Sequence, residues 1–222
     1  MKKPKACIFD VNGTLIDDMN YHFDAWSYIL NDKLDANLSE DEVRDQMYGK
    51  NAELLVRVFG PDRFTADEMK ELSSEKENRY QQAFLPHLIL IPGLTALLKE
   101  LQENGILMAI GSAAIPFNIN FVLDNLNIRH YFKAIISADD VRLSKPDPET
   151  FLRAAELMQV EPDACIVFED APKGVEAAQN AGMSCIVLTT MNTPEEFGQY
   201  QNVLEFISDY NNPFIVQNLY RT

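Results

Sequence analysis

Two groups of carboxylates in the sequence have the chemistry for phosphoryl transfer. Asp10 directly follows the apolar residues 6–9, and the pair Glu169-Asp170 directly follows the apolar residues 165–168. An aspartate can accept a phosphoryl group covalently as aspartyl-phosphate. Carboxylate oxygens are also the ligands that Mg²⁺ uses in proteins, often only one or two of them beside a substrate phosphate. These residue types therefore indicate metal-assisted chemistry on a phosphate ester.

The residues after Asp10 suit a turn that binds an anion. Gly13 follows Asn12, and a glycine there permits a tight turn whose backbone amides point toward a bound anion. An Asn-Gly pair is also ordinary turn chemistry in proteins that bind nothing at that point. The turn alone therefore leaves a binding and a purely structural interpretation open.

Short apolar runs alternate with helical patterns along most of the chain. The runs are followed by or end in polar residues at Asp10, Gly111-Ser112, Ser137, Glu169-Asp170 and Thr189-Thr190. Helical patterns separate them at residues 94–102, 117–126, 150–158 and 175–180. This alternation predicts an α/β fold with a doubly wound, Rossmann-like parallel sheet. Ligands bind such sheets outside the carboxyl ends of the strands, which is where Asp10, Ser112, Glu169 and Asp170 fall.

Residues 17–87 interrupt the alternation and predict a helical insertion. They show helical periodicity without a buried-strand run, and segments beginning at Ser39 and Thr65 have the spacing of a capping box. We expect a core domain of residues 1–16 and 88–222 and a helical domain of residues 17–87. Residues 202–222 are amphipathic and ambiguous, and we expect them to pack on the core.

The net charge of the chain limits the classes of molecule that it is expected to bind. A net charge of −15 without clustered Lys and Arg argues against nucleic acid. A phosphorylated small molecule remains compatible with this charge, because a bound divalent cation and a few lysines can make the local electrostatic field positive.

The cysteines and the apolar runs indicate the compartment. Cys7, Cys165 and Cys185 fall in apolar runs, which predicts buried thiols. No stretch is long enough for a signal peptide or a membrane span, so we expect a cytoplasmic protein without a membrane partner.

Four motifs together give a specific resemblance. The segment Asp10-Val11-Asn12-Gly13-Thr14 resembles the DxDGT signature of the haloacid dehalogenase superfamily, and its companions follow in order at Ser112, at Lys145 in a Ser-Lys-Pro-Asp-Pro segment, and at Glu169-Asp170. The insertion, with the sequence YHFDAW at 21–26, is similar to the helical cap of the β-phosphoglucomutase-like branch. The resemblance covers nearly the whole chain. It implies a monomeric, Mg²⁺-dependent phosphatase that acts on a small phosphorylated metabolite.

The resemblance also implies roles for individual residues. The catalytic set is Asp10 as nucleophile, Asn12, Ser112 and Lys145. The metal set is Asp10 and Asp170, the backbone carbonyl of Asn12, and Glu169 through water or indirect contacts. The substrate-binding set is Val11, Thr14, His22, Gly49, Lys50, Lys76 and Ala113. His22 resembles a residue that couples cap closure to proton transfer, although a histidine beside aromatic residues is also typical of a packed core.

The chain departs from the family pattern at Asn12. The family has an aspartate there that acts as general acid and base, and an amide cannot transfer a proton. Three explanations stay open: an introduced substitution, a natural variant for substrates with good leaving groups, or a protein that binds a phosphorylated ligand without turnover. Asp18 and Ala52 replace a hydroxyl residue and an arginine of the β-phosphoglucomutases, which weakens the alternative of a sugar-phosphate mutase.

Overall fold

The structure is a computed structural model that describes residues 3–220, and the strands of this part of the chain form one parallel sheet. The order across the sheet is β3-β2-β1-β4-β5-β6, with β1 between the two halves. The strands are β1 (Ala6–Phe9), β2 (Leu107–Gly111), β3 (Ala134–Ile136), β4 (Cys165–Glu169), β5 (Ser184–Leu188) and β6 (Val203–Ile207). The chain leaves β1 toward β2 on one side and returns to β4 on the other, which is a topological switch point.

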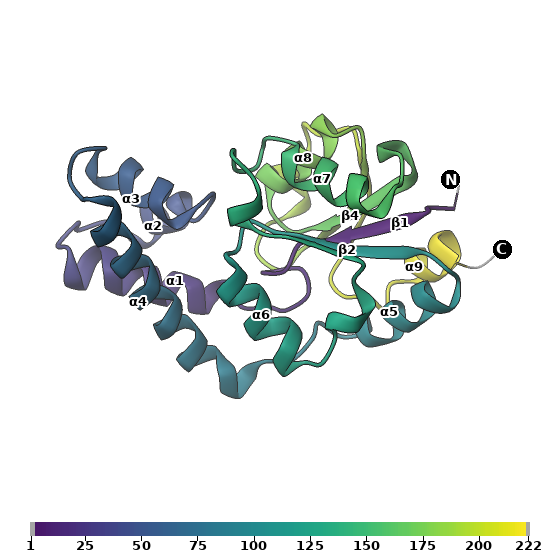
Figure 1. Ribbon diagram of the computed structural model, residues 1–222, viewed down its shortest axis with the longest axis horizontal. Helices are drawn as coiled ribbons and strands as arrows, with labels where there is room; N and C mark the ends of the chain where they lie inside the picture. The colour runs from purple at the N-terminus through teal and green to yellow at the C-terminus, as the bar shows by residue number, and fades with distance from the viewer. Residues whose placement is uncertain (1–2, 221–222) are drawn as a thin grey trace. The chain divides into compact units, whose positions relative to one another are not determined.

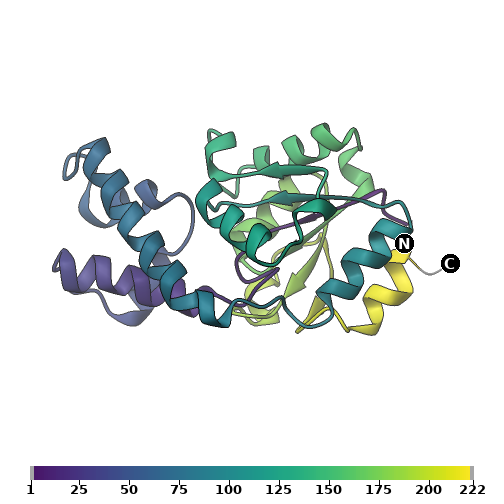
Figure 2. The same cartoon turned by 60° about the horizontal axis from the view of Figure 1, so that its bottom comes forward.

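Helices cover both faces of this sheet (Figure 1). They are α5 (Leu94–Glu103), α6 (Pro116–Asn125), α7 (Glu149–Met158), α8 (Pro172–Asn180) and α9 (Pro213–Ile215). Figure 1 shows α7 and α8 over one face, and α5, α6 and α9 over the other. After α9 the chain continues as a π-helical segment, Val216–Tyr220, which packs against α5 (Figure 2). Short 3₁₀ turns occupy Arg129–Tyr131, Ala138–Asp140, Pro162–Ala164 and Pro194–Phe197.

Burial on both faces explains why the strands are continuous apolar runs. Successive side chains of a strand point to opposite faces. In β1, Ile8 belongs to a core cluster shared with α7 and α8, whereas the ring of Phe9 stacks on Phe168 with centroids 4.6 Å apart. All four residues of β1 are fully buried. The predicted α/β class with a doubly wound parallel sheet is confirmed.

A second compact unit consists of helices. It contains α1 (Met19–Ser27), α2 (Glu40–Gln46), α3 (Asn51–Phe59) and α4 (Ala66–Phe84), with a π-helical segment Tyr28–Lys33 and a 3₁₀ turn Leu85–His87. The capping boxes expected at Ser39 and Thr65 form at the starts of α2 and α4. Its core contains Trp26, Ile29, Leu30, Val43, Leu54, Leu55 and Leu72.

Contacts divide the chain at two points. The sheet unit combines the segment ending at Asp17 with the segment beginning at Ile89, and the helical unit is Asp18–Leu88. These limits differ by one residue from the predicted ones. Among residues 3–220, no helix is both long and apolar enough to cross a membrane.

The ambiguous segment 202–222 contributes the edge strand β6, which the sequence did not reveal. Val203 to Phe206 are only half-buried, and Glu205 interrupts the apolar run. An edge strand tolerates such residues because one side of it faces solvent. The pattern of a fully buried strand was therefore absent.

Candidate active site

Asp10 lies at the middle of the carboxyl edge of the sheet because β1 is paired on both sides. Phe9, the last residue of β1, is in register with residues of both β2 and β4. The main-chain N–H of Asp10 still donates to the carbonyl of Phe168 at 3.0 Å. Ser112 follows β2 directly, and Glu169-Asp170 closes β4. The predicted residues from three strand ends are therefore neighbours.

Lys145 joins two of these carboxylates. It comes from the loop between β3 and α7, and its Nζ atom lies 2.7 Å from Asp10 Oδ1 and 2.7 Å from Glu169 Oε1. The ammonium also lies 4.7 Å from the ring centre of Phe151 in α7. Lys145, Asp10 and Glu169 are all buried. Charged groups at this depth require close partners, and here each has one.

The pKa values reflect this burial. Burial raises the pKa of Asp10 to about 6, against the opposing effect of the positive charge of Lys145. The negative charge of Glu169 raises it further, while a hydrogen bond with Ser112 lowers it. For Lys145, burial alone would lower the pKa, but Asp10 and Glu169 raise it above its ordinary value. Lys145 is therefore a permanent positive charge beside an aspartate that is mostly ionised at neutral pH.

Two glycines let carboxylates approach the backbone closely. A Cβ atom on Gly13, which has φ +68°, would lie 2.0 Å from Asp170 Oδ2. A Cβ atom on Gly174 in α8 would lie 1.8 Å from Glu169 Oε1. The other oxygen of Glu169, Oε2, accepts hydrogen bonds from the N–H groups of Asp170 and Ala171, both at 2.8 Å. The Glu169 carboxylate is thus fixed by the start of α8 and by Lys145.

We expect Gly174→Ala to destabilise the protein by about 1–3 kcal/mol, the usual cost of overpacking. In an ordinary helix the same change would stabilise by up to about 1 kcal/mol, but here the new methyl group collides with Glu169. Denaturant unfolding measures the difference. Gly198→Ala is the matched control, since its Cβ would meet nothing closer than 3.5 Å. Equal stability of the two variants would contradict the expected collision.

The donor atoms at this edge suit Mg²⁺. The predicted ligands, the carboxylates of Asp10 and Asp170 and the carbonyl of Asn12, are all hard oxygens. Asp10, Glu169 and Asp170 are buried with one ammonium, that of Lys145, which leaves an excess of two negative charges when all are ionised. A divalent cation would balance that excess. Within residues 3–220, no three His, Cys, Asp or Glu side chains form a metal-binding group, and Mg²⁺ needs only one or two carboxylates because it retains water.

His22 and Lys76 of the predicted substrate set meet inside the helical unit. Lys76 Nζ lies 2.6 Å from His22 Nδ1 and 3.1 Å from both carboxylate oxygens of Glu77. The other ring nitrogen, His22 Nε2, lies 3.3 Å from Asp18 Oδ2. Burial lowers the pKa of Lys76, and the charges of Glu77 and Asp18 oppose that effect. The ammonium of Lys76 therefore has an anionic partner within its own unit.

Gly49 and Lys50 directly precede α3, and Lys50 is its N-cap residue. The N–H of Lys50 donates to Glu53 Oε2 at 2.9 Å, and Gly49 has φ +75°. A Cβ atom on Gly49 would lie 2.4 Å from the same oxygen. The glycine is thus needed for the capping of α3, whatever else the loop binds.

The other predicted residues lie in the loops of the carboxyl edge. Thr14 is fully buried, and its hydroxyl donates to Asp170 Oδ1 at 3.4 Å. Val11 is buried and its carbonyl accepts from the N–H groups of Thr14 and Leu15 at 3.3 and 2.8 Å. Asn12 is half-buried between them, and Ala113 is half-buried directly after Ser112. Substrate contacts of these residues remain predictions.

Three residues outside the predicted site sets contact the same loops. Thr190 donates to the carbonyl of Gly13 at 2.8 Å, Asn192 to the carbonyl of Asp170 at 2.9 Å, and Tyr210 to the carbonyl of Thr14 at 2.9 Å. Thr190 follows a strand that ends at the same edge, so its position was a usable signal. Tyr210 follows the edge strand β6, for which no such signal existed.

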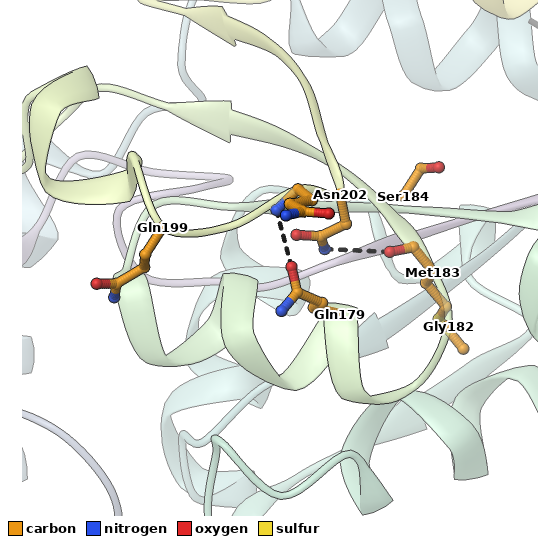
Figure 3. Close-up of a pocket in the computed structure, with 7 residues that line it drawn as sticks. Gln179, Gly182, Met183, Ser184, Gln199 and Asn202 are labelled. Carbon is orange, nitrogen blue, oxygen red and sulfur yellow. Dashed lines mark hydrogen bonds between the residues drawn. The ribbon is translucent and has the colours of Figure 1, made fainter.

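A separate cavity of about 560 Å³ lies at the opposite, amino edge of the sheet, before β5 and β6 (Figure 3). Its lining residues are Gln179, Gly182, Met183, Ser184, Gln199, Gln201 and Asn202. In Figure 3, Gln179 accepts a hydrogen bond from the main chain at 2.8 Å and Asn202 donates to the carbonyl of Met183 at 3.1 Å. No charged side chain and no predicted site residue lines it, so it does not suit a phosphate ester.

Comparison with known proteins agrees with the motifs. Residues 4–182 match the family model described as haloacid dehalogenase-like hydrolase. The chain is 33% identical over 189 residues to β-phosphoglucomutase of Bacillus subtilis, covering 82% of each chain. It is 30% identical over 184 residues to a fructose-1-phosphate phosphatase of Escherichia coli, covering 81% of this chain and 93% of that one.

Solved structures show the same likeness. The crystal structure of β-phosphoglucomutase from Clostridium difficile superposes with a TM-score of 0.82 at 26% identity, covering 96% of both chains. The chain therefore belongs to the haloacid dehalogenase-like hydrolases, a family whose members include phosphatases and phosphomutases. The predicted family membership and enzyme class, a hydrolase of phosphoric esters, are confirmed.

Proposed function

We propose that the protein is a Mg²⁺-dependent phosphatase that acts on a small phosphorylated metabolite through an aspartyl-phosphate on Asp10. The observation that carries the proposal is the buried contact of Lys145 Nζ with Asp10 Oδ1 at 2.7 Å, beside Asp170 at the carboxyl edge. A nucleophilic carboxylate, a fixed positive charge and metal-type oxygen ligands are the parts that phosphoryl transfer requires. Sugar phosphates are the first candidate substrates, because the relatives of known activity include a fructose-1-phosphate phosphatase.

In the proposed reaction a carboxylate oxygen of Asp10 attacks phosphorus, and the bond from phosphorus to the leaving oxygen breaks. Lys145 and the Ser112 hydroxyl stabilise the negative charge of the transferring group. Asp10, Asp170 and the Asn12 carbonyl would hold Mg²⁺, which would supply charge neutralisation at the phosphate. Water then hydrolyses the aspartyl-phosphate and restores Asp10. Asn12 cannot protonate the leaving oxygen, so the proton comes from water.

We propose that residues 17–87 act as a cap that selects the substrate, with His22, Gly49, Lys50 and Lys76 as its candidate contacts. Lys76 has an anionic partner in Glu77, which favours a substrate without a second phosphate. The pairing of Lys76 with Glu77 and the alanine at position 52 both favour a phosphatase over a mutase that handles a bisphosphate.

The test is phosphate release from a panel of sugar phosphates, nucleotides and pyrophosphate, with Mg²⁺ and with the metal removed by a chelator. We expect release that requires Mg²⁺. A second candidate, a binding protein with little turnover, is favoured by Asn12 alone. Tight binding of a phosphate ester without release across the panel would support that alternative and contradict the phosphatase.

We expect Asp170→Ala to remove the Mg²⁺ site, because it deletes one of two predicted side-chain ligands. Isothermal titration calorimetry of Mg²⁺ measures this directly. Asp163→Ala is the matched control: it removes the same charge near the amino end of β4, in the turn Pro162–Ala164. Equal Mg²⁺ affinity in the two variants would exclude Asp170 as a ligand.

A further inference from the structure

The loop after β5 contacts both segments that carry the proposed metal ligands. Thr190 Oγ1 donates to the carbonyl of Gly13 at 2.8 Å, which belongs to the turn after Asp10. Asn192 Nδ2 donates to the carbonyl of Asp170 at 2.9 Å. The two donors lie two residues apart in one short loop. We call this loop, residues 189–193, the β5 loop.

Both acceptors belong to peptide groups whose orientation affects the site. A peptide group is planar, so a hydrogen bond to its carbonyl also fixes its N–H group. The Gly13 carbonyl shares a peptide plane with the N–H of Thr14, which closes the turn onto Val11 at 3.3 Å. The Asp170 carbonyl shares a plane with the N–H of Ala171, which donates to Glu169 Oε2 at 2.8 Å. The β5 loop therefore fixes the orientation of two peptide groups, one between Gly13 and Thr14 and one between Asp170 and Ala171.

The turn after Asp10 and the segment at Asp170 lie very close together. A Cβ atom on Gly13 would lie only 2.0 Å from Asp170 Oδ2, so the Asp170 carboxylate lies directly against the turn. Thr14 Oγ1 reaches the other oxygen, Asp170 Oδ1, at 3.4 Å. A small shift of either segment would change the separation of the ligands from β1 and β4. The pairing of β1 with β4 ends at the hydrogen bond from the Asp10 N–H to the Phe168 carbonyl, before Gly13 and Asp170 are reached.

We propose that Thr190 and Asn192 are positioning residues that set the spacing of the two ligand-bearing segments and so tune the site for Mg²⁺. The inference rests on the proposed metal site. Mg²⁺ requires nearly ideal octahedral geometry at about 2.0–2.1 Å, whereas Ca²⁺ accepts longer and more variable distances. Residues that orient metal ligands typically change metal affinity by 10–100-fold when they are replaced.

The experiment measures Mg²⁺ and Ca²⁺ affinities by calorimetry in four single variants. Thr190→Val keeps the shape of the side chain and removes the donor, and Asn192→Leu does the same at its position. Thr190→Ser retains the hydroxyl and is the conservative rescue. Thr189→Val is the matched control, because the Thr189 hydroxyl in the same loop donates instead to the carbonyl of Ile207 in β6 at 3.3 Å.

We expect the Kd for Mg²⁺ to rise 10–100-fold in Thr190→Val and Asn192→Leu and to stay unchanged in Thr190→Ser and Thr189→Val. The Kd for Ca²⁺ should rise less, so that the preference for Mg²⁺ over Ca²⁺ falls. A general loss of stability would weaken both ions alike, and that result would contradict the inference. Thermal unfolding of each variant confirms that the proteins compared are folded.

The proposed metal site and this inference fail in distinguishable ways. Absence of Mg²⁺ binding by the unaltered protein would overturn both. Binding by the unaltered protein with equal Mg²⁺ affinity in Thr190→Val and Thr189→Val would overturn the positioning role alone. In the double variant of Thr190→Val with Asn192→Leu, we expect a combined loss smaller than the product of the single losses, because both donors act on one spacing.

Discussion

Asp10→Asn is expected to abolish phosphate release, with a loss of at least about 10⁴-fold, as for the loss of a nucleophile in other covalent enzymes. An amide nitrogen or oxygen is far too weak a nucleophile to form the phosphorylated intermediate. The change is nearly isosteric, and Lys145 keeps its second partner, Glu169, at 2.7 Å. The fold should therefore persist. Steady-state phosphate release and circular dichroism measure the two effects.

The covalent route gives a second readout for Asp10. Acid quenching during turnover followed by mass spectrometry should find one phosphoryl group on the unaltered protein and none on Asp10→Asn. Asp147→Asn is the matched control, since Asp147 lies two residues after Lys145 and accepts from the main chain of Glu149 at 2.9 Å. Substantial turnover by folded Asp10→Asn would exclude the aspartyl-phosphate mechanism.

Asn12→Asp is expected to raise turnover of alkyl or sugar phosphates by about 10²–10⁴-fold, the range attributed to general acid–base catalysis. The nucleophile, Lys145 and Ser112 are present without it, so positioning and electrostatic stabilisation do not depend on the change. Only proton transfer to the leaving oxygen and from the attacking water is missing. Kinetics of the two proteins on the same phosphate esters give the ratio.

The size of this gain should depend on the leaving group. Aryl phosphates depart with little protonation, so Asn12→Asp should accelerate them much less than alkyl phosphates. A change in metal affinity would accelerate both classes equally. Asn120→Asp adds the same charge in α6, where the side chain already accepts from Arg129 at 2.7 Å, and it should leave both rates unchanged.

The result also decides between the interpretations of Asn12. A large, leaving-group-dependent gain identifies an enzyme that lacks one proton-transfer group. If Asn12→Asp binds Mg²⁺ but stays inactive on a broad panel of phosphate esters, the phosphatase proposal falls and the binding protein remains. The backbone carbonyl of residue 12 is the same in both proteins, so metal binding should not change.

The helical unit contains a buried pair of opposite charges, Lys76 and Glu77. Lys76 and Glu77 are both almost fully buried and contact each other at 3.1 Å. Because a buried ammonium with an anionic partner attracts a further anion weakly, we expect this pair to affect substrate choice rather than the chemical step. The sequence suggested that Lys76 contacts a phosphate, and that role remains a prediction.

The fold class and the order of the motifs could be predicted from the sequence. Continuous apolar runs that precede Asp10, Ser112 and Glu169 are what a sheet buried on both faces requires, and parallel strands bring their carboxyl ends to one edge. Periodicity and the capping boxes at Ser39 and Thr65 likewise determined the helical insertion. These features are local, so they can be recognised before any tertiary contact is known.

The contacts that hold the carboxylates could not be predicted from the sequence, because they form between distant parts of the chain. Lys145 is separated in sequence from Asp10 by 135 positions and from Glu169 by 24. No local sequence pattern predicts contacts between residues so far apart in the chain. The contacts of Thr190 and Asn192 depend on the pairing of β5 beside β4, and that of Tyr210 on the half-buried edge strand β6, whose apolar run is interrupted. Hydrogen bonds to backbone carbonyls leave little trace in residue type, because any side chain with a donor of suitable length can make them. Their positions follow from strand order and register, which only the folded chain defines.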